Sequence, residues 1–189
     1  GYKTIDQLIL THADKDHAGG LQELADLVVI KQVITDKQAV MDYKNIEFIS
    51  LLAENDFGNE NDNSIVLLSR IGALDYLFTG DASQAFENQL LSVYPNIKCD
   101  VLKVGHHGSN SSSSALFLQT LRPQIAVISA GRNNRYGHPH DEVLARLADY
   151  QIKCFRTDLQ GDIEIKSFLN FNFIITGSRE FGIINKVIR

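Results

Sequence analysis

The sequence predicts an α/β protein in which short strands alternate with helices. Apolar runs rich in Val, Ile and Leu recur along the 189 residues, and segments of helical pattern separate several of them. Two such runs, 64–69 and 74–79, are joined by a short turn that contains Gly72, which predicts a hairpin. This periodicity fits two mixed sheets packed face to face with helices outside, and it also fits three layers around one sheet.

The first half of the chain contains three further predicted strands. They are Gln7–Thr11, Val28–Thr35 and Ile46–Leu52, and a helix over Leu21–Leu27 follows the first of them. The polar stretch Glu54–Asn63 is expected to be a loop that leads into the hairpin.

The second half alternates more regularly between helices and strands. We expect helices over Ser83–Val93, with Ser83 as N-cap and Pro95 as the stop, over Ala115–Leu121 and over Asp141–Tyr150. We expect strands over Cys99–Val104, Gln124–Ser129, Ile152–Arg156 and Asp162–Phe168. The tail Asn170–Arg189 has apolar runs but no pattern that assigns it.

Composition limits the class of protein. Hydrophobic content of 44% and charged content of 22% are ordinary for one globular domain. No run approaches the roughly 20 apolar residues that span a bilayer, and no signal peptide opens the chain. The net charge of −5 argues against nucleic-acid binding by bulk electrostatics, although it permits a phosphodiester held locally by metals. Cys99 and Cys154 lie in apolar runs and are interpreted as buried core thiols.

The polar segment after the first strand contains four ligand-type side chains within six positions: His12, Asp14, Asp16 and His17. A strand that ends in a dense group of imidazoles and carboxylates aims several donors at one point. This mixture suits a divalent ion such as zinc, manganese or iron. A lone His-x-Asp would more often be an ordinary loop, but this density predicts a metal site.

All six histidines fall in three pairs: His12 and His17, His106 and His107, and His138 and His140. Each pair follows an apolar run at its C-terminal end, as does Asp81. Loops at one edge of a rigid scaffold are where functional sites are usually built. We therefore expect the three pairs to converge in space.

These motifs together resemble a known family. The segment H-x-D-x-D-H from His12 to His17 is similar to the H-x-H-x-D-H motif of the metallo-β-lactamase superfamily, with Asp14 in place of the second His. That variant, and His106-His107-Gly-Ser, resemble the metallo-hydrolase domain of ComEC-type DNA-uptake (competence) proteins. The resemblance covers about Asp6 to Gly161 and includes Gly80-Asp81 and Gly137-His138-Pro-His.

The resemblance implies a fold, a setting and a substrate. The fold would be an αββα sandwich that lacks its first N-terminal strands, because the family carries strands with an earlier Asp motif before this point. Residues 1–189 would form a single domain, a fragment of a larger multi-pass membrane protein, lying outside the cytoplasm next to that protein's membrane channel domain. The implied activity is metal-dependent hydrolysis of DNA phosphodiesters, single-stranded or duplex, during DNA uptake.

The resemblance also implies two divalent ions, zinc or manganese, bridged by Asp81. A carboxylate has two oxygens and a charge that can offset two cations, whereas Thr-Gly-Asp alone is also good turn chemistry. Asp14 would harden the site and favour manganese. The first ion would take His12, Asp14 and Asp81, with His106 as a candidate fourth ligand. The second would take Asp16, His17, Asp81 and His138.

Three residues are predicted to act in the reaction: Asp16, His106 and His107. Asp16 would orient the attacking water. The family's third motif, a His before the bridging Asp, has no counterpart here, because Asn61-Asp62-Asn63 occupies that region. His106 would then supply the missing nitrogen, or else protonate the leaving group together with His107. Since neighbouring side chains of a strand face opposite ways, we expect at most one of the pair to point at the metals while strand geometry persists.

Other residues have open interpretations. His138 is preferred as ligand, because Pro139 restricts it to an extended backbone, and His140 is assigned to the helix start or to a supporting role. Ser111–Ser114 precedes a helix and would either receive a phosphate or form a capped loop. The rival functions are hydrolysis of a small ester or lactone, and a non-catalytic module that binds DNA or partner domains.

Overall fold

A seven-stranded mixed sheet forms the centre of the computed structural model, which describes residues 3–39, 41–44, 46–52, 54–168, 171–177 and 181–184. Its order is β11-β10-β9-β8-β7-β6-β5. The strands are β5 (Met41–Tyr43), β6 (Ile46–Leu51), β7 (Val66–Ile71), β8 (Leu74–Phe78), β9 (Val101–Lys103), β10 (Ile125–Ile128) and β11 (Lys153–Arg156). β5 to β8 pair antiparallel, and β8 to β11 pair parallel.

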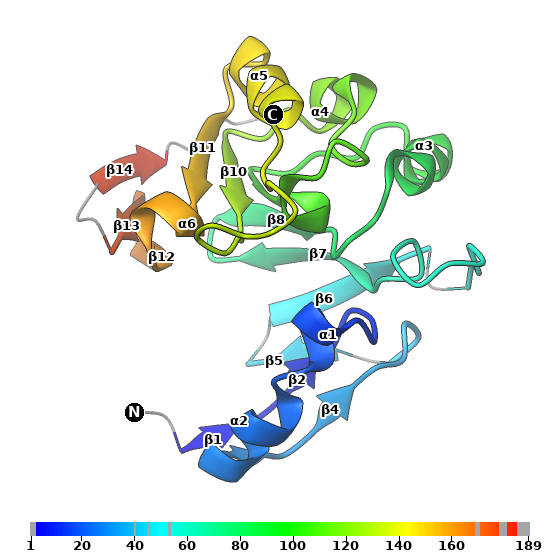
Figure 1. The fold of residues 1–189 in the computed structure, drawn as a ribbon, viewed down its shortest axis with the longest axis vertical. Coiled ribbons are helices and arrows are strands. Elements are labelled where there is room, and N and C mark those ends of the chain that lie inside the picture. Colours follow the sequence, from blue (N-terminus) through cyan, green and yellow to red (C-terminus); the bar gives the residue numbers. More distant parts are fainter. Residues whose placement is uncertain are drawn as a thin grey trace.

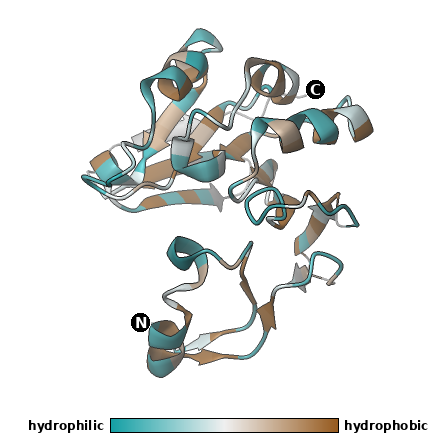
Figure 2. Cartoon of the chain, turned by 45° about the vertical axis from the view of Figure 1, so that its right-hand side comes forward, coloured by the Kyte–Doolittle hydropathy of each residue, from teal (hydrophilic) through white to brown (hydrophobic). Residues whose placement is uncertain are grey.

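Three helices cover one face of this sheet: α3 (Gln84–Val93), α4 (Ala115–Leu121) and α5 (Asp141–Asp149) (Figure 1). Hydrophobic and hydrophilic bands alternate along them, as expected for helices with one buried face (Figure 2). Phe86, Phe117 and Leu147 contribute to the same core cluster as Leu77 and Leu102 of the sheet. Burial of each such side chain stabilises the fold by about 1.5–3 kcal/mol, so this cluster is the main core.

The opposite face of the sheet is covered by three small sheets. An antiparallel sheet of β12 (Ile163–Phe168), β13 (Phe171–Thr176) and β14 (Phe181–Ile184) packs Ile174 against Tyr76 and Phe155. The N-terminal segment contributes two parallel pairs, β1 (Thr4–Ile5) with β3 (Val29–Ile30) and β2 (Leu8–Ile9) with β4 (Val33–Ile34). Figure 1 shows this segment, in blue, below the central sheet, with α1 (Lys15–Ala18) and α2 (Leu21–Leu27) beside it. The expected second sheet of the sandwich is therefore present as three separate small sheets.

Most predicted elements are confirmed, with differences in extent. The expected strand Val28–Thr35 is divided into β3 and β4, although both keep one parallel register against β1 and β2. At the interruption Lys31 Nζ lies 2.6 Å from Asp6 Oδ1 and Gln7 donates to Gln32. The backbone N–H groups of Lys31 and Leu8 still donate to the carbonyls of Ile5 and Gln32, so the two chain segments stay paired there. α6 (Thr157–Gln160) was not expected.

The cysteines and the tail complete the comparison. Cys99 is buried as expected, whereas Cys154 on β11 is only partly buried. The tail forms β13 and β14, which no pattern had assigned, and residues 169, 170, 178–180 and 185–189 lie outside the described part of the chain. No helix of the described residues is both long and apolar enough to cross a membrane.

Backbone N–H groups of the serine run before α4 bind a buried carboxylate. The N–H groups of Ser113 and Ser114 donate to the two oxygens of Glu87, a residue of α3 that is 3% exposed. Ser114 Oγ accepts a hydrogen bond from Phe117 N and caps α4, and Ser112 Oγ donates to the Gly105 carbonyl. These contacts support the capped-loop interpretation of Ser111–Ser114, because the N–H groups of Ser113 and Ser114 already bind Glu87 and are not free for a phosphate.

The same carboxyl group predicts a pH dependence of stability. Burial raises the pKa of Glu87 to about 7, although the N–H groups of Ser114 and Ser113 favour its ionised form. Because the folded-state pKa lies above the ordinary value of 4.5, this contribution to stability is complete below pH 4.5 and is lost as the pH rises through about 7. The full loss is about 3 kcal/mol in the free energy of unfolding.

The glutamine of Glu87→Gln is uncharged at every pH, as the protonated carboxyl group of Glu87 is. The variant is therefore expected to lose the contribution of Glu87 to the pH dependence of the free energy of unfolding. Urea unfolding at pH 5 and pH 8 measures it, and the wild-type protein should lose more stability between them than the variant. The matched control is Glu142→Gln, an exposed glutamate in the first turn of α5. Equal pH slopes for wild type and Glu87→Gln would contradict the assignment.

Candidate metal centre

The candidate site lies where several strands of the fold end. His12 follows β2, Asp14 is the N-cap of α1, and Asp16 and His17 lie within α1. Asp81 follows β8 after Gly80, and the short 3₁₀ helix η1 (Gly105–Gly108), which contains His106 and His107, follows β9. The loop after β10 contains His138. The expected convergence of these segments is confirmed, because rings of neighbouring histidines lie 4.0–6.4 Å apart between centroids.

Four of these residues form a group that can hold a cation. One ligand atom each from Asp16, His17, Asp81 and His107 lies within 4.8 Å of the others. Asp81 is 3% exposed and stands between the imidazoles. Its Oδ1 is 3.1 Å from His17 Nε2, and its Oδ2 is 3.7 Å from both His106 Nε2 and His107 Nε2. Two carboxylates with two imidazoles suit a divalent transition metal.

The Nδ1 atoms of four imidazoles contact protein oxygens. His107 Nδ1 donates to the Ser129 carbonyl at 2.7 Å, and His106 Nδ1 is 3.2 Å from Ser111 Oγ. His12 Nδ1 is 3.0 Å from Thr11 Oγ1, and His17 Nδ1 is 3.3 Å from the same oxygen. This is the usual arrangement of metal-binding histidines, since it fixes the tautomer and leaves Nε2 free to coordinate.

The Nε2 atoms and carboxylate oxygens of the site lie so close together that a positive charge is needed between them. His17 Nε2 lies 3.2 Å from His107 Nε2, and the carbonyl contact of His107 requires its proton on Nδ1. The lone pair on His107 Nε2 and the Asp81 carboxylate therefore both lie close to His17 Nε2. Their negative charge density is offset either by a proton on His17 or by a bound cation. In the described part of the chain, buried His12 Nε2 and Asp81 Oδ1 have no hydrogen-bond partner of good geometry. The donor set fits a metal.

The pKa directions agree with this electrostatic picture. The 3.1 Å contact between His17 Nε2 and the Asp81 carboxylate, which is within hydrogen-bond distance although its angle is poor, raises the pKa of His17 despite partial burial. Burial would raise the pKa of Asp81, but His17 and the nearby imidazoles lower it overall, so Asp81 is a carboxylate at neutral pH. Burial lowers the pKa of His12, and burial lowers that of His138 together with the charges of the neighbouring histidines. His12 and His138 are therefore neutral and able to act as ligands.

The residues predicted for the first metal lie beside this group. His12 Nε2 is 3.8 Å from Asp14 Oδ2, and the His12 ring is 4.0 Å from that of His17. His106 faces Asp81, and its ring is 5.6 Å from that of His138. His107 was predicted to be catalytic, with the choice of metal ligand between it and His106 left open, and it lies within the four-residue group.

The expectation that only one of the adjacent histidines faces the site is wrong. His106 (φ 46°, ψ 47°) and His107 (φ 53°, ψ 18°) both have left-handed backbone conformations, so the alternation of a strand ends before them. Positive φ is uncommon for residues other than glycine and often marks functional positions. As a result both Nε2 atoms lie 3.7 Å from Asp81 Oδ2.

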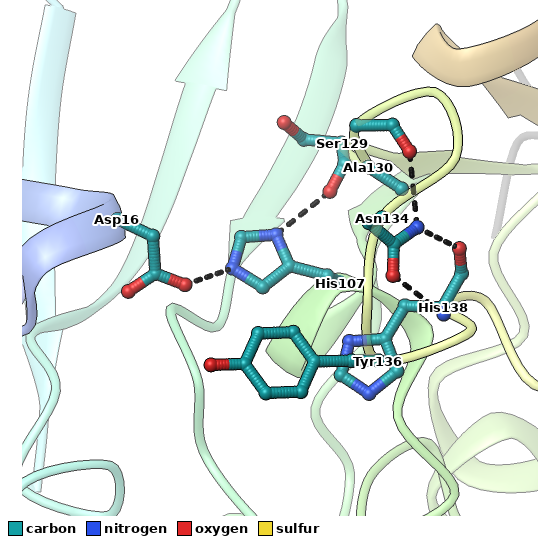
Figure 3. Close-up of a pocket in the computed structure, with 8 residues that line it drawn as sticks. Asp16, His107, Ser129, Ala130, Asn134, Tyr136 and His138 are labelled. Atoms are coloured by element: carbon teal, nitrogen blue, oxygen red, sulfur yellow. Dashed lines mark hydrogen bonds and ion pairs between the residues drawn. The ribbon is translucent and has the colours of Figure 1, made fainter.

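His138 lines a pocket next to the group, and His140 supports the loop. The pocket, of about 320 Å³, is lined by Asp16, His107, Tyr136 and His138, among others (Figure 3). Asn134 holds the His138 backbone through its N–H and its carbonyl. His140 is the N-cap residue of α5; its Nδ1 accepts from Asn110 N, and its Nε2 contacts the Tyr136 carbonyl. Both ring nitrogens of His140 are thus engaged with the backbone, in agreement with a supporting role.

Two hydroxyl residues of the site carried no sequence signal. Thr11 contacts His12 and His17, and Ser64 Oγ lies 3.2 Å from His12 Nδ1 and accepts from Asp81 N.

Asp62, in the region of the missing histidine motif, is buried and accepts hydrogen bonds from Ser83 N and Ser83 Oγ. It therefore anchors the start of α3.

Comparisons with known proteins agree with this geometry. The model of the metallo-beta-lactamase superfamily matches residues 2–54, which include the His12–His17 motif. ComE operon protein 3 of Bacillus subtilis is 38% identical over 88% of this chain, and competence protein ComA of Neisseria gonorrhoeae is 33% identical over 87%. The chain has a metallo-β-lactamase-like fold and is similar over most of its length to ComEC-type competence proteins.

Further comparisons show how much of each relative this chain matches. Recombination protein 2 of Haemophilus influenzae is 32% identical over 87% of the chain. The chain spans about a quarter of the length of these curated relatives. A solved structure of a CmlA beta-hydroxylase E377D mutant superposes with a TM-score of 0.51 at 13% identity, covering 82% of this chain and 43% of that one, and this supports the fold alone.

Proposed function

We propose that this domain is a dinuclear metal-dependent phosphodiesterase that cleaves DNA during competence-related DNA uptake. The observation that carries the proposal is the group of Asp16, His17, Asp81 and His107, whose ligand atoms lie within 4.8 Å of one another. His12, Asp14, His106 and His138 stand around it and supply further nitrogen and oxygen donors. Two divalent ions, zinc or manganese, would be held with Asp81 between them.

Each residue has a role that follows from its position. When bound, divalent ions of this kind lower the pKa of a water molecule and offset charge on phosphoryl oxygens. Asp16 is exposed at the edge of the pocket, where it can orient that water. His106 has its Nδ1 against Ser111 Oγ and its Nε2 towards Asp81, a position from which it can donate a proton to a leaving oxygen. We assign His107 to the metal group and, with His106, to the acid–base step.

The pocket beside the metal group supports a nucleic-acid substrate. Tyr136 is 56% exposed, and its ring stacks with that of His138 at 5.7 Å between centroids. The guanidinium carbon of Arg135 lies 4.6 Å from the centroid of the Tyr136 ring. An exposed aromatic ring with an adjacent arginine can bind a base and a phosphate of a single strand without bulk positive charge. The names of the competence relatives point the same way.

We also propose that residues 1–189 act as one domain of a longer membrane protein, outside the cytoplasm and next to its channel domain. The relatives, whose length is about four times that of the matched region, support this setting.

Metal analysis and a nuclease assay test the proposed function together. The purified protein, dialysed against zinc or manganese, is expected to retain up to two ions per chain. It should then cleave single-stranded or plasmid DNA, and a chelator should stop the reaction. Retention of metal with hydrolysis of small esters or lactones, but not DNA, would favour the ester hydrolase. Absence of bound metal in a folded protein would favour a non-catalytic DNA-binding or partner-binding module.

A further inference from the structure

The turn that contains His106 and His107 has an unfavourable backbone conformation. Both residues have positive φ, 46° and 53°, and non-glycine residues stay in this region only where the surrounding structure holds them there. Within the turn, Ser109 N donates to the His106 carbonyl at 2.7 Å. Because one hydrogen bond is little support for two such residues, contacts from outside the turn must hold it as well.

The serine segment that follows the turn contacts it at several points. Ser112 is buried, and its Oγ lies 2.8 Å from the Gly105 carbonyl oxygen and 3.0 Å from that of Ser109. Gly105 packs closely on this residue, since a Cβ atom there would lie 3.4 Å from Ser112 Cβ. Ser111 Oγ lies 3.2 Å from His106 Nδ1. The serine segment therefore holds both ends of the turn and one of its imidazole rings.

One buried carboxylate and one arginine hold the serine segment in turn. The N–H groups of Ser113 and Ser114 donate to the two carboxylate oxygens of Glu87 on α3. Arg146 on α5 donates from Nη2 to the Ser112 carbonyl at 3.0 Å, and its positive charge attracts the Glu87 carboxylate. Both helices bury apolar side chains in the main core. These two charged residues therefore connect the core to the turn.

We propose that Glu87 and Arg146 are positioning residues that hold the turn in the conformation in which His106 and His107 both face Asp81. They act through the serine segment. Both histidine Nε2 atoms lie 3.7 Å from Asp81 Oδ2 in this conformation. The inference rests on the proposed function, because the turn belongs to the same metal site.

Two substitutions remove this support from different sides. Glu87→Gln leaves one side-chain oxygen for two backbone donors, so either Ser113 N–H or Ser114 N–H loses its partner. A buried donor without a partner corresponds to about 10- to 100-fold in an equilibrium constant. Arg146→Met keeps an apolar stem on α5 and removes the donor to the Ser112 carbonyl. Arg146→Lys can still donate to that carbonyl and should restore the wild-type behaviour.

Native-state hydrogen exchange measures the opening of the turn in the metal-free protein, because it reports each backbone N–H separately. The measurement is made at pH 8, above the pKa of about 7 that burial gives Glu87. His106 N donates to the Gly80 carbonyl, and Ser109 N to that of His106. In Glu87→Gln and Arg146→Met, both N–H groups should exchange about 10- to 100-fold faster relative to those of β7 and β8 than in the wild type.

Activity provides a second readout, and an exposed residue provides the control. In the zinc- or manganese-loaded protein, the single-turnover rate of DNA cleavage should fall about 10- to 100-fold in the same two variants. Glu142→Gln, which changes an exposed glutamate on α5, should alter neither the exchange of the turn nor the rate.

Faster exchange at Ser113 and Ser114 alone, with His106 and Ser109 unchanged, would overturn the inference, since Glu87 would then support only the start of α4. An equal change at every amide would also overturn it, because that marks a loss of overall stability, as would a wild-type cleavage rate in both variants. Arg146→Met carries the test if circular dichroism shows that Glu87→Gln does not fold. Failure of the wild-type protein to bind metal or cleave DNA would overturn the proposed function instead, and hydrogen exchange would still decide whether Glu87 and Arg146 hold the turn.

Discussion

Asp81→Asn is expected to abolish tight metal binding and, with it, hydrolysis. Asn has nearly the same shape as Asp, so the fold should persist while the buried negative charge between the imidazoles of His17 and His107 is lost. Because Asp81 is proposed to contact both ions directly, its removal should exceed the 10- to 100-fold effect typical of supporting residues. Metal content and affinity by chelator competition measure this effect, and the DNA cleavage rate should fall in parallel.

The metal-free variant provides a second readout. The hydrogen bond with Asp81 is the main cause of the raised pKa of His17, so this pKa should fall in Asp81→Asn, as followed by NMR titration. Asp75→Asn is the matched control and should alter neither property, because Asp75 lies on β8, the strand that precedes Asp81, and its carboxylate pairs with Arg70 away from the site. Full metal occupancy in Asp81→Asn would exclude the assigned role.

Sequence patterns predicted the parts of this domain that depend on local chemistry. The helix over Ser83–Val93 was predicted together with its cap, since Ser83 Oγ accepts from Ala85 N and Pro95 follows the helix. The pairing of histidines after apolar runs predicted their convergence, because strand ends at one edge of a sheet lie close together. The individual ligand and catalytic roles remain predictions.

The features of the fold and the site that the sequence patterns did not predict depend on contacts between residues far apart in the chain. Nothing in the run Ser111–Ser114 reveals that the carboxylate of Glu87 occupies its N–H groups. Ser64 and Thr11 are residue types common in any turn, and their role appears only when Asp81 and the two imidazoles are brought together. The left-handed conformation of His106 and His107 is likewise set by their surroundings, and strand alternation gave the wrong expectation for their side chains.

Substitution of the two adjacent histidines should separate metal binding from proton transfer. His107 lies in the four-residue group, 3.2 Å from His17 Nε2 and 3.5 Å from Asp16 Oδ2, so His107→Ala should lower metal affinity as well as rate. His106 contacts Ser111 Oγ through Nδ1 and is 3.7 Å from Asp81. As the proton donor to the leaving group, its loss should lower kcat by about 10²- to 10⁴-fold while the metal remains bound.

Metal content and single-turnover DNA cleavage, measured on the same preparations, distinguish the two roles of His106. Retained metal with a reduced rate in His106→Ala identifies the acid, whereas loss of one ion identifies His106 as the nitrogen ligand that replaces the missing histidine motif. His140→Ala is the control, since both of its ring nitrogens contact backbone groups, and it should affect stability more than rate. A His106→Ala protein with unchanged metal content and unchanged rate would refute both roles, because each requires its imidazole to act beside Asp81.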